Sequence, residues 1–292
     1  MKRLICYLLA GIATTATLSA HSDEASWTQP QKPFQVYGNT YYVGTLGLSA
    51  ILVTSPQGHV LIDGTLEHNA PLIEANIRAL GFRVEDIRVI LNSHAHSDHA
   101  GGIAELARVS GAKVRASVAG AKAMNLGGND PDDPQYDGAA HYPVIANIGV
   151  VRDGETIRIG TSELIAHYTP GHTPGGTSWT WRSCDQGHCL NMVYADSLTP
   201  ISSDGFHYSG DATHKERVKS YRQTLATVAA LPCDILITPH PDASDLMERV
   251  AKRDQGLQPN PLVDTQACKA YAAGAGVKLD ARLVKEQTER PH

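Results

Sequence analysis

The sequence has no excess of basic residues. Its 25 Lys and Arg side chains are outnumbered by 30 Asp and Glu side chains, which gives a formal net charge of -5. A protein that binds a nucleic acid needs a positively charged surface to neutralise the phosphates. We therefore expect no nucleic-acid partner. The proportions of 42% hydrophobic and 19% charged residues also exclude a disordered or collagen-like chain and predict a globular fold with a sizeable core.

Long apolar runs are also absent downstream of the N-terminus. The chain begins with Lys2 and Arg3, continues with an apolar run at residues 4–12, and then has small residues up to Ala20. This order is typical of a secretory signal peptide. The alternative, a membrane anchor, would need about 20 apolar residues. We predict that residues 1–20 are a cleaved signal peptide, that the mature chain is periplasmic, and that no membrane segment remains in it.

Cysteines are few, and their spacing does not match a common zinc finger. Cys6 lies in the predicted signal peptide, and the other four are Cys184, Cys189, Cys233 and Cys268. Four cysteines allow three pairings, and an oxidising compartment favours disulfides over free thiols. Proximity, with a turn-forming glycine between the first two, favours Cys184 with Cys189, which leaves Cys233 with Cys268. A zinc cluster is the alternative interpretation.

Strand and helix patterns alternate in two successive halves, without short-period repeats or coiled-coil heptads. Each half has a set of strands followed by helices, which predicts an α/β fold of two packed sheets with helices outside, a four-layered αβ/βα sandwich. The expected strands are residues 34–45, 50–55, 59–62, 87–91, 113–116, 150–152, 156–159, 163–168, 177–182, 190–195 and 234–238. The expected helices are residues 69–80, 100–109, 214–230, 243–253 and 264–285, the last with possible interruptions at Gly274 and Gly276. Two long loops are expected at residues 126–142 and 199–212.

The run S-H-A-H-S-D-H-A-G-G at residues 93–102 follows a predicted buried strand and opens a predicted helix. Residues two apart in an extended chain project to the same side, so His94 and His96 can bind one ion. Asp98 and His99 point elsewhere because the helix begins there. Imidazole nitrogen and carboxylate oxygen are suitable ligands for Zn²⁺. The spacing therefore indicates a site for two metal ions.

Two ions require more ligands than this segment supplies. His172 follows a predicted strand in the turn T-P-G-H-T-P-G-G, and His240 follows another in T-P-H-P. Loops at strand ends gather functional residues in α/β folds. Either histidine alone would more often be an ordinary loop residue, but their shared position makes both candidate ligands.

With these residues, the chain resembles the metallo-β-lactamase superfamily, and within it the subclass B3 β-lactamases. The motif H-x-H-x-D-H marks the superfamily, and the similarity extends from the hairpin ending L-I-D-G-T at residues 61–65 to His240. The resemblance implies that residues 21–292 form one metallo-β-lactamase catalytic domain holding two zinc ions. It implies a first zinc on His94, His96 and His172, and a second zinc on Asp98, His99 and His240.

The stretch Y-A-D-S-L-T at residues 194–199 is similar to the B3 segment in which two hydroxyl side chains bind the substrate carboxylate. Here these would be Ser197 and Thr199, the second position often being serine in that subclass. Related thioesterases and lactonases use an aspartate in this region to bridge the metals. We expect Asp196 instead to contact a metal ligand from behind. Asp63 is expected to accept a hydrogen bond from a ligating histidine or from the backbone near it.

The resemblance implies hydrolysis of the β-lactam amide of penicillins, cephalosporins and carbapenems by a metal-bound hydroxide, with Asp98 as the catalytic residue that orients it. The serine-hydrolase motif G-x-S-x-G is absent around Ser197. The expected partner is a small-molecule β-lactam, and the chain is expected to be a monomer. The alternatives are a lactonase or thioesterase similar to glyoxalase II, and a zinc-binding periplasmic protein without catalysis.

Overall fold

The computed structural model describes residues 24–289, and twelve strands in this part of the chain form two sheets. The seven-stranded sheet follows the sequence order β1 (Phe34–Tyr37), β2 (Thr40–Tyr42), β3 (Ile51–Val53), β4 (His59–Ile62), β5 (Ile87–Leu91), β6 (Lys113–Ala116) and β7 (Gly149–Val150). The five-stranded sheet has the order β12 (Ile235–Ile237), β11 (His188–Tyr194), β10 (Thr177–Asp185), β9 (Ser162–Tyr168) and β8 (Thr156–Ile159). The predicted signal peptide lies outside the described residues.

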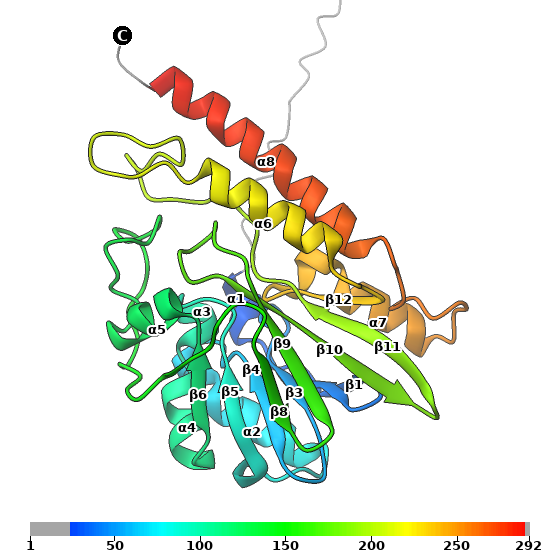
Figure 1. The fold of residues 1–292 in the computed structure, drawn as a ribbon. Coiled ribbons are helices and arrows are strands. Elements are labelled where there is room, and N and C mark those ends of the chain that lie inside the picture. Colours follow the sequence, from blue (N-terminus) through cyan, green and yellow to red (C-terminus); the bar gives the residue numbers. More distant parts are fainter. Residues whose placement is uncertain (1–23, 290–292) are drawn as a thin grey trace, which may run out of the picture.

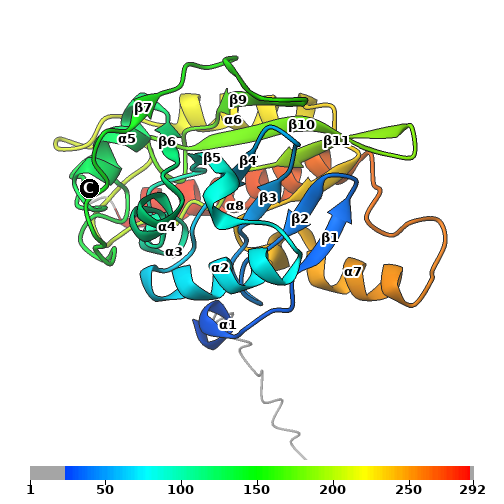
Figure 2. The ribbon, with the colours of Figure 1, turned by 90° about the horizontal axis from the view of Figure 1, so that it is seen from below.

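The sheets mix antiparallel and parallel pairing. Strands β1 to β4 pair antiparallel as a meander, and β4 to β7 pair parallel. In the second sheet β8 to β11 are antiparallel, and β12 joins β11 in parallel. The inner faces meet in one apolar core that includes Tyr42, Ile62, Trp179, Tyr194 and Ile237. Figure 2 shows the two sheets packed on each other.

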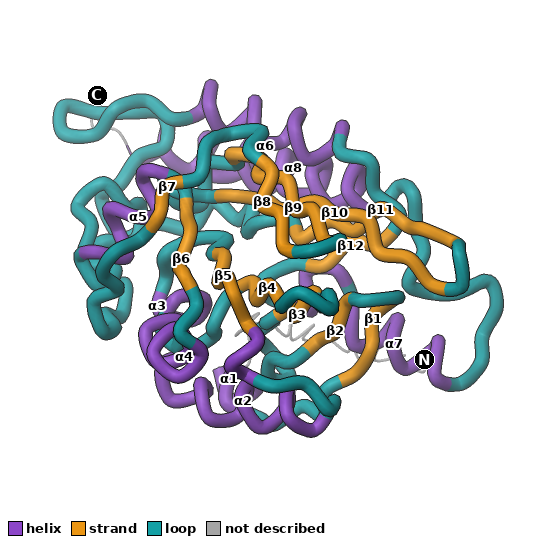
Figure 3. The backbone as a smooth tube through the Cα atoms, turned by 60° about the horizontal axis from the view of Figure 1, so that its bottom comes forward, coloured by secondary structure: helices purple, strands orange, loops and turns teal. Residues whose placement is uncertain are grey.

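Helices cover both outer faces of this pair of sheets, as Figures 1 and 3 show. On the first sheet they bury a second apolar cluster with Leu61, Ile77 and Ile90, and on the second sheet they bury a third with Val193 and Leu236. The four layers confirm the predicted αβ/βα sandwich. The α-helices are α1 (Glu24–Thr28), α2 (Ala70–Ala79), α3 (Ser97–Ala100), α4 (Ile103–Ser110), α5 (Val118–Asn125), α6 (Val218–Ala230), α7 (Leu246–Asp254) and α8 (Ala267–Glu289), and the 3-10 helices are η1 (Glu67–Asn69), η2 (Val84–Asp86) and η3 (Pro241–Ser244).

The helices differ from the prediction at residues 100–109 and at α5, and the possible interruptions of the last helix are absent. The helix expected at residues 100–109 is two helices, α3 and α4, separated at Gly101 and Gly102. Helix α5 was missed, although Ser117 caps it by accepting a hydrogen bond from the Gly120 N–H at 3.1 Å. Helix α8 continues through Gly274 and Gly276 because it packs along α6 and buries Ala275 and Leu279. Tertiary packing outweighs the low helix propensity of glycine there.

Both disulfides favoured by the cysteine spacing are present. Cys184 and Cys189 face each other across the β10–β11 hairpin, and Cys233 is joined to Cys268 at the start of α8. The second bond ties the segment before β12 to the outer helical layer. No helix within residues 24–289 is both long and apolar enough to cross a membrane.

Candidate metal centre

The six candidate ligands come together at one end of the sandwich. His94 and His96 lie between β5 and α3, and Asp98 and His99 lie in α3. His172 lies in the β9–β10 turn, and His240 follows β12. All the loops that carry them follow the carboxyl ends of strands, where such folds place functional residues.

Backbone contacts fix the position of the α3 segment. The glycine pair after α3 packs against the turn that follows β4, and a Cβ atom on Gly102 would lie only 2.3 Å from the carbonyl oxygen of Gly64. The Gly64 N–H donates to the His99 carbonyl at 2.8 Å. Glycine at residue 102 therefore allows the β4 turn and the ligand segment to approach closely.

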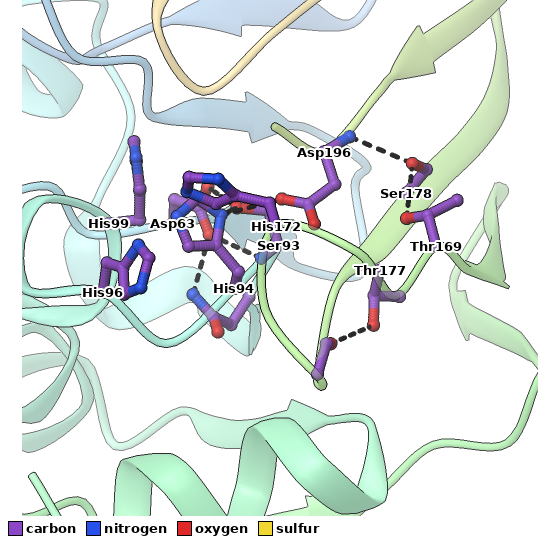
Figure 4. A network of polar contacts seen from close by, with 12 residues as sticks. Asp63, Ser93, His94, His96, His99, Thr169, His172, Thr177, Ser178 and Asp196 are labelled. Atoms are coloured by element: carbon purple, nitrogen blue, oxygen red, sulfur yellow. Dashed lines mark hydrogen bonds and ion pairs between the residues drawn. The ribbon is translucent and has the colours of Figure 1, made fainter. Parts of the chain in front are cut away.

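His94, His96 and His172 form the first group, and their ligand atoms lie within 4.8 Å of one another. The ring of His94 lies 4.8 Å from the rings of His96 and His172, and those two rings are 4.9 Å apart. Figure 4 shows these side chains, His94 and His96 from one segment and His172 from another.

One nitrogen of each ring in the first group is held by a hydrogen-bond acceptor. Nδ1 of His94 lies 2.7 Å from Asp196 Oδ1, Nδ1 of His172 lies 2.7 Å from the Thr199 carbonyl oxygen, and Nε2 of His96 lies 3.1 Å from Asp133 Oδ2. The other nitrogen of each ring can therefore serve as a ligand. Nε2 of His94 is buried and has no hydrogen-bond partner in the described part of the chain, as expected for a nitrogen that faces an ion.

Asp98, His99 and His240 form the second group. Oδ2 of Asp98 lies 3.1 Å from Nε2 of His99 and 3.2 Å from Nε2 of His240. The two imidazole nitrogens are 3.3 Å apart. The His94 ring lies 4.4 Å from the His99 ring, and a grouping of His94, Asp98 and His99 is also compact enough for an ion. The two groups therefore adjoin.

Burial and neighbouring charges shift the pKa of four of these groups. For His96, burial lowers the pKa, but the hydrogen bond and charge of Asp133 outweigh it and raise the pKa. Burial, reinforced by the neighbouring imidazoles, lowers the pKa of His94 well below its ordinary value and that of His172 to about 3. Burial opposes ionisation of Asp98, but His99 and His240 outweigh it and hold the pKa of this carboxyl well below its usual range. Two neutral imidazoles, His94 and His172, thus stand near an ionised carboxylate, and imidazole nitrogen with carboxylate oxygen is a donor set that fits Zn²⁺.

The Asp63 side chain supports the segment that carries the ligands by accepting hydrogen bonds from the residues just before His94, and not from a histidine. Its carboxylate accepts hydrogen bonds from the Ser93 N–H at 2.7 Å, the Asn92 amide at 3.0 Å and the Tyr194 hydroxyl at 2.8 Å. The residue is fully buried and has a positive φ of 62°, a conformation that aspartate tolerates better than most residues. Asp63 therefore fixes the start of the loop that carries His94.

Asp196 lies behind His94, where it holds the Nδ1 atom (Figure 4). Its backbone N–H donates to Ser178 Oγ at 3.0 Å, and its side chain is fully buried. Burial raises the pKa of this carboxyl well above its ordinary value. A carboxylate in this position orients a ligand ring.

Ser197 and Thr199 lie in the segment that follows β11. Ser197 is 6% exposed, and Thr199 is half-buried. The contact between the Thr199 carbonyl and His172 places this segment directly against the first group.

Two further residues beside the site were not identified from the sequence. Asp133, in the loop at residues 126–142, contacts His96, and the only signal for it was the acidic and proline-rich composition of that loop. Trp27 of α1 packs its ring 5.5 Å from that of His240. A cavity of about 370 Å³ opens there between Trp27, His240 and Met247.

Comparisons with known proteins identify the family of this chain. The family model described as the metallo-beta-lactamase superfamily matches residues 43–185. The solved structure of the Rm3 metallo-beta-lactamase is 52% identical, with 90% of this chain and 97% of that chain covered and a TM-score of 0.87. MEM-A1, a subclass B3 metallo-beta-lactamase from a soil metagenome library, is 50% identical, with 90% and 100% covered and a TM-score of 0.87.

The curated relatives are more distant. A hydroxyacylglutathione hydrolase of Anaeromyxobacter dehalogenans is 33% identical over 124 residues, which are 42% of this chain and 38% of that protein. Another, from Polaromonas sp., is 28% identical over 199 residues, which are 65% of this chain and 60% of that protein. The chain thus spans less than two thirds of either hydrolase, but nearly all of the two β-lactamase structures. From the fold, the site and these similarities together, the chain belongs to the metallo-β-lactamase superfamily, in which its structural neighbours include subclass B3 enzymes.

Proposed function

We propose that this chain is a zinc-dependent β-lactamase of the B3 type that hydrolyses the amide bond of penicillins, cephalosporins and carbapenems. The observation that carries the proposal is the convergence of two adjoining groups of three ligands from three separate segments of the chain, residues 94–99, His172 and His240. The similarity to β-lactamases over nearly their whole length supports this substrate class.

His94, His96 and His172 would hold one zinc ion, and Asp98, His99 and His240 a second. The unpartnered Nε2 of His94 and the short distances around Asp98 Oδ2 support this assignment. When bound, zinc supplies Lewis-acid catalysis and makes a water nucleophile available at neutral pH.

Asp98 lies where the two groups meet, and its Oδ2 atom is shared between His99 and His240. Its other carboxylate oxygen can accept a hydrogen bond from the attacking water and so orient it. Hydrolysis adds the elements of water across the amide: oxygen bonds to the carbonyl carbon, the carbon–nitrogen bond breaks, and the nitrogen gains the proton. The Asp98 carboxylate is the group on this chain best placed to hold that proton during the transfer.

Ser197 and Thr199 would bind the carboxylate that β-lactams carry beside the ring. Hydroxyl donors suit a carboxylate acceptor, and the Thr199 backbone already contacts His172. Asp196 and Asp63 would support the centre through His94 and the Ser93 backbone. The substrate is a small molecule, and we propose that the chain acts as a monomer in the periplasm after removal of residues 1–20.

Hydrolysis of nitrocefin and imipenem by the purified protein tests this function. We expect turnover of both, loss of turnover after dialysis against a chelator, and recovery when zinc is returned. Zinc-loaded protein that leaves both compounds intact would contradict the proposal.

The second candidate is a thioesterase or lactonase of the same fold, which the similarity to hydroxyacylglutathione hydrolases favours. The position of Asp196 behind His94 speaks against this candidate, because those enzymes use an aspartate in this region to bridge the metals. Lactoylglutathione and a simple lactone, assayed beside nitrocefin, separate the candidates by relative kcat/KM.

A further inference from the structure

A carboxylate from the long loop at residues 126–142 reaches the ligand segment. The two oxygens of Asp133 lie 3.1 and 3.2 Å from Nε2 of His96. The Asp133 side chain is 6% exposed, and its Oδ1 atom also accepts the Gln135 N–H at 2.7 Å. This carboxylate is therefore nearly removed from water and aimed at one ring nitrogen.

The contact determines which nitrogen of the His96 ring is turned toward the other two histidines of the first group. In His94 and His172 the outer nitrogen is Nδ1, so Nε2 is the inner one. In His96 the outer nitrogen is Nε2, so Nδ1 is the inner one. A neutral imidazole carries its proton on either nitrogen, and the acceptor that it meets selects the tautomer.

The loop that carries Asp133 is fastened on both sides. The Tyr142 hydroxyl donates to the carbonyl of Ala95, between His94 and His96, at 2.7 Å. The Ser203 N–H donates to the Pro134 carbonyl at 2.8 Å, which joins this loop to the segment that follows Thr199. These bonds hold the Asp133 carboxylate at a defined place beside His96.

We propose that Asp133 is a positioning residue for the first metal site, which holds the Nε2–H of His96 so that Nδ1 is the ligand atom. The inference rests on the proposed ligand set and extends it, since it assigns the His96 tautomer and links the loop at residues 126–142 to one of the two ions. Outer carboxylates that orient a ligating histidine typically contribute about 10- to 100-fold to metal affinity.

Zinc affinity measured by competition with a chromophoric chelator tests this role directly. We expect Asp133→Ala to weaken one of the two zinc sites about 10- to 100-fold and to leave the other within about twofold. Asp133→Asn keeps an oxygen acceptor at the same place, so it should retain more affinity than Asp133→Ala.

Asp132→Ala is the matched control. Asp132 is the chain neighbour, its side chain is 65% exposed, and its ion-pair partner is Lys122 on α5 and not a histidine. This variant should bind both zinc ions as the unmodified protein does. Any general effect of changing the charge or flexibility of the loop would appear in it.

A second readout concerns the metal-free protein. At a pH where the His96 ring is neutral, its nitrogen chemical shifts should report the Nε2–H tautomer in the unmodified protein and a mixture of tautomers in Asp133→Ala. Equal zinc affinities and an unchanged tautomer in Asp133→Ala would overturn the proposal. An equal loss at both zinc sites with a lower melting temperature of the metal-free protein would also overturn it, because it indicates a general structural role. These outcomes do not depend on which substrate the enzyme hydrolyses.

Discussion

The Nδ1 atom of His94 lies 2.7 Å from Oδ1 of Asp196, and neither side chain is exposed to solvent. Because burial lowers the pKa of His94, the ring is neutral and donates Nδ1–H to the carboxyl group. The opposite nitrogen, Nε2, then keeps a free lone pair that can bind a metal ion. The hydroxyl of Ser93, which is also fully buried, lies farther from the same nitrogen, at 3.4 Å.

Replacement of Asp196 should therefore weaken the metal site without removing a ligand. In Asp196→Ala the Nδ1–H of His94 loses its acceptor, at a cost of about 1–3 kcal/mol, and zinc affinity should fall by about 10- to 100-fold. Calorimetric zinc titration and thermal unfolding of the metal-free variant measure the two effects. Unchanged zinc affinity would show that Asp196 does not orient His94.

His172→Ala should lose the first zinc and nearly all turnover. A residue that binds the metal contributes more to zinc binding than a residue that only orients it. We therefore expect kcat/KM to fall by more than about 100-fold. Metal content per chain and nitrocefin kinetics provide the measurement. His188→Ala is the control, since His188 is exposed on the β10–β11 hairpin, where it pairs with Asp185, and within residues 24–289 its side chain has no hydrogen bond or ion pair.

Thr199→Val should raise KM more than it lowers kcat. The substitution removes the hydroxyl but keeps the branched shape and the backbone carbonyl that holds His172. One hydrogen bond to a charged carboxylate is worth about 1.5–3 kcal/mol, so KM should rise about tenfold or more. Thr199→Ser keeps the hydroxyl, so its KM should equal that of the unmodified protein. An unchanged KM in Thr199→Val would exclude this side chain from substrate binding.

Glu286 on α8 should make part of the stability depend on pH. Its fully buried carboxylate accepts hydrogen bonds from the Tyr208 N–H at 2.8 Å and from Arg282 Nε at 2.8 Å. Burial raises its pKa, but these bonds outweigh burial and lower the pKa below its ordinary value near 4.5. The folded state therefore favours the charged form, so this stabilisation is present above about pH 4.5 and is lost as the pH falls through the folded pKa.

Melting temperatures of Glu286→Gln and the unmodified protein, measured in the metal-free state from pH 7 to pH 3, check this prediction. We expect the variant to be less stable by about 1–3 kcal/mol at pH 7 and the difference to shrink in acid. Glu289→Gln, which alters an exposed ion pair with Lys285, should show almost no difference. A loss of stability in Glu286→Gln that stays constant with pH would contradict the inference that the Glu286 carboxylate is charged in the folded protein.

Much of the fold could be predicted because hydrophobic periodicity is local. The strands at residues 87–91 and 113–116 have the predicted bounds, since the first is mostly branched apolar residues and the second alternates charged and apolar residues directly after Gly111 and Ala112. Helix α5 was missed because its alanine and glycine residues give a weak amphipathic pattern. The continuity of α8 through two glycines was also unpredictable, because it depends on contact with α6.

The sequence by itself determined the chemical types at the site: five imidazoles and a carboxylate, each in a segment that follows a strand. It also limited the cysteine pairings and indicated the superfamily through H-x-H-x-D-H. The tertiary structure alone decided which nitrogen of each first-group ring faces the centre. The acceptors for His94, His96 and His172 lie 102, 37 and 27 residues away in the chain. The tautomer of an imidazole depends on the atom within hydrogen-bonding distance, and only folding brings those acceptors there.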